Sequence, residues 1–588
     1  MKSLAIYLIT IILAFSAKGQ YYLRGEVRDE KNLPISNVKI FVHSSRSLVY
    51  TGPYGSFGFN VNPIYDSLTL SADGFETKSV RVKSEAWQQL VLKANVLQAS
   101  KSKPKLLSVT GDFTPHGRPR WFAGNETYFQ LVENEEVDPL KYPITSFSLN
   151  VNKASYSNIR RFLNMQSSVP PDAVRIEEMI NYFNLHYRKP EADNTFDIET
   201  AISPCPWNPS HGLLYINTSA RKVPLENIPP GNFVFLVDVS GSMDMPDKLP
   251  ILKAAFQLFV KNLRPIDTMS IVMYGGSVGI WLPPTPGDQK EKISKAIEEL
   301  TPGGDTPGES ALLAAYKLAE SSFIKGGNNR VILATDGDFN VGKSSEQALD
   351  ELITRQRQTG IYLTCLGVGK GNYKDSKLQT LARKGNGNFA YFDNVAEAEK
   401  VLVKELTQTL YAVADDVLMK VEFNAAQVKS YRLIGFDNKK EVMSDTDSEM
   451  EGSEIGTGSN TLAIFEIEPG NMTQFTTPDG SQNFIARISL NYSLCNDTSR
   501  KILRKLVFNN YLTINKLDKD YHFAAAVAFF GLMLKQSKYL PKTEWKDVYN
   551  FAKVAADKDI YLQTELLGLI AKSEKLYKKN KKRFKKKS

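Results

Sequence analysis

Between residues 231 and 410, apolar segments of two kinds alternate along the chain. Uninterrupted runs such as Phe233–Val237, Met269–Tyr274 and Val331–Ala334 have the length and composition of strands that are buried on both faces. Between them, apolar residues recur every three or four positions, as in 249–263, which predicts amphipathic helices. This alternation predicts a doubly wound, mostly parallel α/β sheet of the Rossmann-like type, with ligand sites at the carboxyl ends of its strands.

The pattern on either side of this region is different. Residues 20–95 show short alternating strands separated by turn residues at regular spacing, which predicts a small β-sandwich. Residues 96–120 are rich in Ser, Lys, Pro and Gly and are interpreted as a linker. Residues 121–225 and 411–571 mix helical and strand patterns, so we expect flanking α+β segments. Since 588 residues exceed what one core can hold, the chain is expected to be multidomain.

The N-terminus has the features of an export signal. Lys2 precedes the apolar run Leu4–Phe15, and Ala17 and Gly19 are small residues suited to cleavage, so residues 1–19 are predicted to be a signal peptide. No Cys follows the run, so a lipoprotein is not expected. We therefore expect an exported protein in the periplasm or at the cell surface, and an uncleaved anchor is the alternative.

The net charge of +9 is concentrated at the C-terminus. Residues 572–588 hold ten Lys and Arg against Glu574 alone, a balance equal to the excess of the whole chain. Such a basic tail can contact a membrane surface or an anionic polymer. The alternative is a solvated terminus without a partner, and recognition of a specific nucleic acid is not expected.

Three chain segments that end strands or begin helices carry short oxygen-bearing side chains. Asp238, Ser240 and Ser242 follow the predicted strand Phe233–Val237. Thr306 precedes a later predicted helix, and Asp336 comes at the end of the predicted strand Val331–Ala334. Carboxylate and hydroxyl oxygens suit Mg²⁺, and Mn²⁺ would fit the same set. Such residues are also common in turns and helix caps, so the residue types alone leave both a metal site and a structural role open.

The D-x-S-x-S sequence at Asp238, with the later Thr306 and Asp336, resembles the metal-ion-dependent adhesion site of von Willebrand factor type A (vWA) domains. The resemblance implies that both serines and the threonine ligate the ion directly or nearly so, whereas the two aspartates act mainly through water. It also implies an open coordination position for an Asp or Glu of a protein partner. Asp305 stands where many relatives carry Ser and adds a carboxylate near the site.

The resemblance extends beyond the vWA region. Ser146–Leu163 and Pro170–Phe183 resemble the segment that precedes the vWA domain in one family of exported bacterial proteins, and Tyr431–Gly435 fits the C-terminal domain of that family. Residues 20–95 resemble a carboxypeptidase-regulatory-like domain. The predicted organisation is a signal peptide 1–19, a β-sandwich 20–95, a linker 96–120, a von Willebrand-like N-terminal segment 121–225, a vWA domain 231–410, a C-terminal α+β domain 411–571 and a basic tail 572–588.

The expected function is metal-dependent protein binding, in adhesion or assembly, and not enzymatic catalysis. The sequence contains no HExxH, no G-x-S-x-G and no phosphate-binding G-x-x-x-x-G-K-[ST] motif. One alternative is a structural cell-envelope protein whose metal only stabilises the fold. A less favoured alternative is a metal-assisted hydrolase, for which Asp305 or Asp338 would have to act as the base. The vWA resemblance also makes Val395–Leu410 the candidate for a helix that moves on ligation.

Overall fold

The computed structural model describes residues 21–585 except for several segments within that range. The chain divides into two units, residues 1–102 and residues 103–588, which are described separately. The predicted signal peptide and Thr306 lie outside the described residues. Those outside are residues 1–20, 31, 53, 73–74, 85, 94–104, 108–125, 129–132, 192–193, 305–307, 338–342, 371–372, 406–407, 409–410, 437–452, 471–483, 495–498 and 586–588.

The N-terminal unit is built from seven strands in two sheets. Alternate residues of each strand point inward, and Leu23, Ile40, Leu68 and Val82 belong to the one hydrophobic core that the strands share. One sheet has the order β4-β1-β7 and the other β3-β2-β5-β6. The strands are β1 (Tyr21–Arg28), β2 (Lys39–Val42), β3 (Ser47–Tyr50), β4 (Ser56–Val61), β5 (Tyr65–Ser71), β6 (Lys78–Lys83) and β7 (Trp87–Val91).

The second unit contains a six-stranded sheet of order β14-β13-β12-β15-β16-β17, as the alternation of strands and helices predicts. All neighbouring pairs are parallel except β13 and β14, because β14 is an antiparallel edge strand. The strands are β12 (Gly231–Asp238), β13 (Thr268–Gly275), β14 (Ser277–Pro286), β15 (Asn328–Thr335), β16 (Ile361–Val368) and β17 (Phe389–Phe392).

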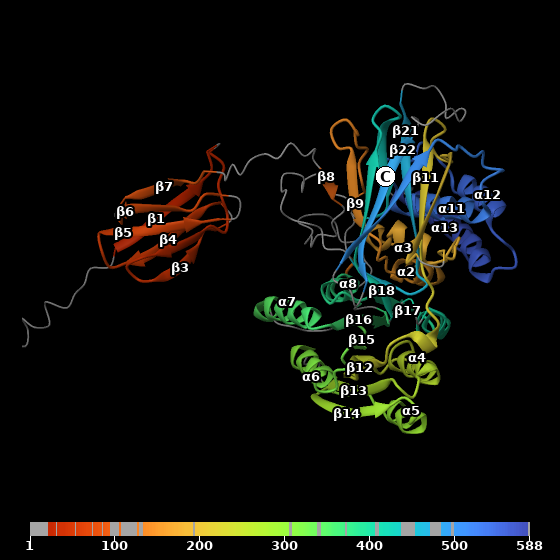
Figure 1. Ribbon diagram of the computed structural model, residues 1–588, viewed down its shortest axis with the longest axis horizontal. Helices are drawn as coiled ribbons and strands as arrows, with labels where there is room; N and C mark the ends of the chain where they lie inside the picture. The colour runs from red at the N-terminus through yellow and green to blue at the C-terminus, as the bar shows by residue number, and fades with distance from the viewer. Residues whose placement is uncertain are drawn as a thin grey trace, which may run out of the picture. The chain divides into compact units, whose positions relative to one another are not determined.

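Helices cover both faces of this sheet, which places one hydrophobic core on each side (Figure 1). The predicted helix at 395–410 begins as α9 and continues as a π-helical turn, η4, over Lys400–Lys404, while residues 406–407 and 409–410 lie outside the described residues. One face is covered by α4 (Leu249–Asn262), α5 (Lys290–Glu298) and α9 (Val395–Glu399), and the other by α6 (Gly308–Ser321), α7 (Lys343–Gln358) and α8 (Asp375–Lys384).

The segments before and after this region share two further sheets. In the sheet of order β23-β22-β18-β9-β8, β9 pairs with β18, and in the sheet of order β10-β11-β21-β19, β11 pairs with β21. The α/β domain is therefore inserted into one α+β body. Its strands are β8 (Lys105–Leu107), β9 (Ile144–Ser148), β10 (Phe196–Pro204), β11 (Gly212–Ala220), β18 (Ala412–Phe423), β19 (Val428–Ile434), β20 (Ser453–Gly456), β21 (Asn460–Pro469), β22 (Phe484–Leu494) and β23 (Arg500–Phe508).

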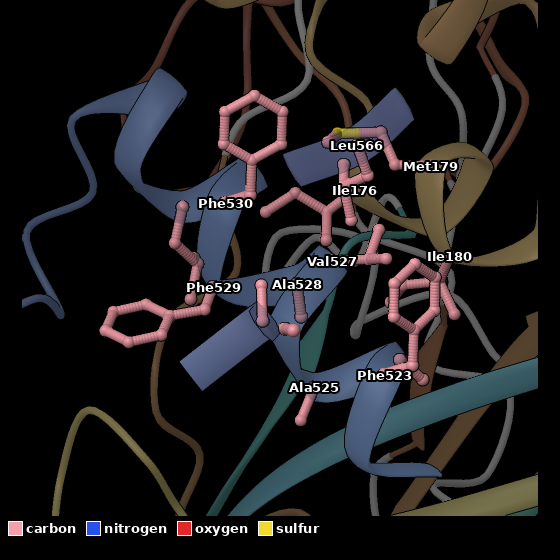
Figure 2. Packing of buried hydrophobic residues seen from close by; sticks show 14 of the residues in the cluster. Ile176, Met179, Ile180, Phe523, Ala525, Val527, Ala528, Phe529, Phe530 and Leu566 are labelled. Atoms are coloured by element: carbon pink, nitrogen blue, oxygen red, sulfur yellow. The ribbon is translucent and has the colours of Figure 1, made fainter. Parts of the chain in front are cut away.

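A group of helices completes the α+β body. The central one, α11, is apolar on nearly all sides, and Figure 2 shows its Phe523 and Val527 among residues of the surrounding helices, including Met179 and Leu566. The helices are α2 (Ala154–Asn164), α3 (Ile176–Asn181), α11 (Lys519–Lys535), α12 (Trp545–Ala555) and α13 (Tyr561–Lys585).

Helix α13 contains most of the segment interpreted as a basic tail. It continues to Lys585, so the boundary expected at residue 572 falls inside a helix. Tyr577 contacts this body, since its ring lies 5.4 Å from that of Trp545 and its hydroxyl accepts a hydrogen bond from the Val169 amide at 3.2 Å. Among the described helices, none is both long and apolar enough to cross a bilayer.

Candidate metal centre

Four of the five predicted site residues meet at one edge of the six-stranded sheet. Asp238 is the last residue of β12, Ser240 and Ser242 lie in the turn that follows, and Asp336 comes directly after β15. Strands β12 and β15 are parallel neighbours, so their carboxyl ends lie side by side. Thr306, the fifth predicted residue, lies outside the described residues.

Hydrogen bonds link the described site residues to one another. The Thr335 hydroxyl donates to Asp238 Oδ2 at 2.8 Å, and the Ser240 amide donates to Asp238 Oδ1 at 2.9 Å. The Ser240 and Ser242 hydroxyl oxygens are 3.1 Å apart. The Ser242 hydroxyl in turn donates to Asp336 Oδ2 at 2.8 Å. The tight turn after β12 thus points both serines toward the two carboxylates.

Both carboxylates are buried, which makes their negative charge costly. Asp238 is 0% exposed and Asp336 is 3% exposed. Burial raises the pKa of Asp238, hydrogen bonds from Ser240 and Thr335 oppose this, and the charge of Asp336 adds to the rise. Burial together with the Asp238 carboxylate also raises the pKa of the neighbouring Tyr274 well above its usual range. A cation at this point would offset the charge of the two carboxylates.

The described residues fit a small, hard divalent cation. The polar side-chain atoms of Asp238, Ser240, Ser242 and Asp336 are all carboxylate or hydroxyl oxygens, the donor type that Mg²⁺ prefers. In an octahedron with metal–oxygen distances of about 2.05 Å, adjacent ligands are about 2.9 Å apart. The 3.1 Å between the serine hydroxyls and the 2.8 Å from Ser242 to Asp336 are close to that spacing. The arrangement can therefore hold Mg²⁺, and Mn²⁺ would accept the same donors.

Two glycine-rich loops pack tightly beside the serine turn. The Gly241 amide donates to Gly304 O at 3.0 Å, and the Gly303 amide donates to Val239 O at 2.6 Å. Gly304 has φ +82°, and a Cβ on it would lie 2.4 Å from backbone atoms of Gly276, so the close approach requires glycine. The chain that leads to Thr306 is thus held against the turn that carries both serines.

Lys248 belongs to this site although the motif did not indicate it. Its ammonium donates to Asp336 Oδ2 at 2.8 Å and to Ser242 O at 2.9 Å. It occupies the N-cap position of α4. A lysine at a helix N-terminus is unfavourable to the helix dipole, and this is the signal in the sequence that could have drawn attention to it. The ammonium compensates part of the carboxylate charge.

Comparison with known protein families matches this architecture. Residues 232–408 match the von Willebrand factor type A domain, residues 123–215 match a family described as von Willebrand factor, and residues 408–576 match the C-terminal domain of the uncharacterized protein YfbK. The fold and the position of the site thus define a multidomain vWA-domain protein.

The uncharacterized protein YfbK of Escherichia coli K12 is 35% identical over 455 residues, which cover 74% of this chain and 79% of that protein. The chain belongs to the YfbK family of vWA-domain proteins. The inter-alpha-trypsin inhibitor heavy chain H2 of Mesocricetus auratus is 28% identical over 206 residues, covering 34% of this chain and 21% of that protein.

Two solved structures show more distant similarity. A von Willebrand factor type A protein from Catenulispora acidiphila has a TM-score of 0.34 at 15% identity, covering 54% of this chain and 76% of that chain. The ArnB paralog VWA2 from Sulfolobus acidocaldarius has a TM-score of 0.33 at 13% identity, covering 65% of this chain and 97% of that chain.

Proposed function

We propose that this protein binds a protein partner through a divalent cation held at the carboxyl edge of the vWA sheet. The ligand set is Asp238, Ser240, Ser242, Thr306 and Asp336, and the ion is Mg²⁺, with Mn²⁺ as a substitute. The observation that carries the proposal is the row of oxygen atoms from Ser240 through Ser242 to Asp336, whose spacing suits octahedral coordination.

The residues of the chain have separable tasks in this proposal. Thr335 and the Ser240 amide hold the two oxygens of Asp238, so that carboxylate is fixed before an ion arrives. Ser242 and Lys248 fix Asp336 in the same way. When bound, the ion supplies a Lewis-acidic position that accepts a carboxylate oxygen of a partner. Preorganised donors reduce the loss of conformational entropy on binding.

We infer a binding role and not a catalytic one. A general base must be free to accept a proton, whereas both oxygens of Asp238 and Oδ2 of Asp336 already accept hydrogen bonds. A metal-assisted hydrolase would have to rely on Asp305 or Asp338, which lie outside the described residues. The similarity of 206 residues to an inter-alpha-trypsin inhibitor heavy chain is consistent with a role in protein interaction.

The remaining predictions complete the proposal. The protein would be exported to the periplasm or cell surface after loss of residues 1–19. The N-terminal unit, similar in pattern to a carboxypeptidase-regulatory-like domain, would serve as a spacer or docking unit. The basic residues from 572 onward would contact a membrane surface or an anionic polymer, with α13 as their support.

Mg²⁺ titration and partner capture test the main proposal. Isothermal calorimetry on residues 20–588 should show one Mg²⁺ site, and Asp238→Ala should abolish it. Cross-linked capture from cell-envelope extract should then yield a partner with wild type in Mg²⁺, but not in EDTA or with Asp238→Ala.

A structural metal predicts a different set of results. In that case EDTA and Asp238→Ala would lower the melting temperature while capture stayed the same. If wild type binds no Mg²⁺, the proposed site is wrong.

A further inference from the structure

The chain between β16 and the first residue of α8 contacts the candidate metal centre, and its described residues, 369–370 and 373–375, are called the β16–α8 loop. Gly337, the residue after Asp336, has φ +91°, and a Cβ on it would lie 2.5 Å from the Lys374 amide nitrogen. At the other end of the loop, Gly369 has φ +83°, and a Cβ there would lie 2.7 Å from the side chain of Lys248. Both ends of the loop therefore touch residues that position the Asp336 carboxylate.

One end of this loop is held by the α+β body through a buried ion pair. Arg175 and Asp375 are both 0% exposed, and their two hydrogen bonds measure 2.7 and 3.3 Å. Glu178 completes the pairing by accepting from Arg175 Nε at 2.6 Å, and the Asn158 amide also donates to Asp375 at 3.3 Å. Removing one partner would leave an unpaired buried charge, so the pair fixes the position of Asp375.

The other end of the loop, at Gly369, is held by the aromatic residue Tyr391. The Tyr391 hydroxyl donates to Gly369 O at 2.6 Å. The guanidinium of Arg161 lies over the Tyr391 ring, 5.3 Å from its centre, and is itself held by two bonds of 2.8 Å to Glu126. Arg161 lies on α2 of the body, whereas Tyr391 lies on β17 of the vWA sheet.

Thr127, which precedes α2 in the sequence, adds a third contact between the two ends of the loop. The Thr127 amide donates to Tyr373 O at 3.1 Å, and the Ser376 amide donates to Thr127 O at 3.4 Å. The hydroxyls of Thr127 and Ser376 are 3.0 Å apart. The body thus contacts the loop directly at Tyr373 and Asp375, whereas Gly369 is held by Tyr391 of the vWA sheet.

We propose that the α+β body braces the candidate metal centre through the described residues of the β16–α8 loop, with Arg175 and Arg161 as positioning residues. The body keeps Lys374 against Gly337 and Gly369 against Lys248, and so holds Asp336 where the ion requires it. This inference rests on the proposed metal-dependent function. Coupling of this kind is reciprocal, so bound Mg²⁺ would in turn strengthen the contact between the body and the vWA domain.

A second buried ion pair between the same two parts provides a matched control. Arg330 of β15 and Glu454 of β20 form two bonds of 2.9 Å, with side-chain exposures of 0% and 7%. Arg330 is six residues before Asp336, which corresponds to about 20 Å along a strand. Breaking this pair leaves a buried charge without its partner at the same interface, but away from the candidate metal centre.

The experiment compares Asp375→Asn with Glu454→Gln in residues 20–588. Calorimetric titration with MgCl₂ should give a dissociation constant at least fivefold weaker for Asp375→Asn. For Glu454→Gln it should stay within twofold of wild type, although both variants lose melting temperature. Equal dissociation constants in the two variants would overturn the brace. Tyr391→Phe removes only the hydroxyl on Gly369 O, and we expect it to weaken Mg²⁺ about threefold, so it serves if Asp375→Asn fails to fold.

Hydrogen exchange separates failure of the brace from failure of the metal site. Without added metal, peptides that contain Gly337 and Lys374 should exchange faster in Asp375→Asn than in Glu454→Gln. If wild type binds no Mg²⁺, the proposed function fails, and the exchange comparison still decides on the brace. Equal exchange in both variants would overturn it.

Discussion

At the scale of single residues, Lys248 contributes a positive charge to the candidate metal centre. Asp238 and Asp336 contribute two negative charges, and the ammonium at 2.8 Å from Asp336 contributes one positive charge. A bound divalent ion would therefore leave these groups with one net positive charge. Such a site favours an anionic ligand, in agreement with a partner that offers Asp or Glu.

Replacing Lys248 by Met should strengthen the binding of Mg²⁺ and weaken the binding of the protein partner. Mg²⁺ affinity is expected to rise about tenfold, or about 1.4 kcal/mol, because a positive charge beside the ion is removed. Capture of an acidic partner should weaken for the same reason. Calorimetry measures the first effect and pull-down in Mg²⁺ the second.

Lys295→Met is the control for Lys248→Met, because Lys295 is an exposed lysine of α5 that lies 3.8 Å from Glu299. This variant should leave both binding steps nearly unchanged. Weaker Mg²⁺ binding by Lys248→Met would show that its main role is to position Asp336.

The sequence predicted the carboxylates and serines of the site but not their support. The D-x-S-x-S spacing is local, so the turn after β12 follows directly from it. Lys248 is six residues beyond Ser242, and Arg175 is 200 residues before Asp375. Contacts over such distances depend on tertiary packing, which periodicity does not encode.

At the scale of elements, the last helix of the vWA domain is tied to the body by charge. Glu405, which follows η4, lies 3.1 Å from both Lys153 and Lys400. Earlier in the same segment, Glu397 lies 2.7 Å from Arg160 of α2. Movement of this helix would have to separate buried ion pairs. A switch of the kind the resemblance suggests would therefore involve the body as well.

Acid should weaken the Glu405 link in a defined pH range. Burial raises the pKa of Glu405, but the two ammonium groups outweigh it and bring the pKa to about 2, below the ordinary 4.5. The ionised form is thus favoured by folding. Its contribution, about 3 kcal/mol, is complete above pH 4.5 and is lost as the pH falls toward 2.

Urea unfolding of wild type and Glu405→Gln between pH 2 and 7 measures this contribution. The difference in the free energy of unfolding should be largest above pH 5 and should shrink on acidification. The exposed pair of Glu422 and Arg487 supplies the control, so Glu422→Gln should show little difference at any pH. A constant difference for Glu405→Gln would contradict the assignment.

At the scale of elements, the sequence predicts strands but not which strands pair with one another. The apolar runs predicted interior strands of the vWA sheet such as β12, β13 and β15, because buried parallel strands have a recognisable composition, but they did not predict the edge strands β14 and β17. The partners of β9 and β11 were not predictable, since Ser148 pairs with Leu418 and Leu213 with Glu466. Residues 121–225 and 411–571 therefore look like separate segments in sequence although they form one body.

At the scale of the whole molecule, the division into two units predicts independent folding. The N-terminal unit has its own core, formed by residues of its seven strands. A chain that begins at residue 103 should keep the melting temperature of the larger unit within about 2 °C. Differential scanning calorimetry of residues 20–588 and 103–588 checks this. A large decrease in the shorter chain would show that the N-terminal unit stabilises the rest.

The insertion of the vWA domain also determines how mechanical load enters the molecule. The connection into the domain passes Arg221, the connection out passes Tyr411, and Thr457 bonds to the backbone carbonyls of both, at 2.9 and 2.8 Å. A pull on a bound partner would reach the body through two adjacent connections that share this residue. Tension is then divided between the interior strands β11 and β18 instead of peeling a terminal strand from an edge.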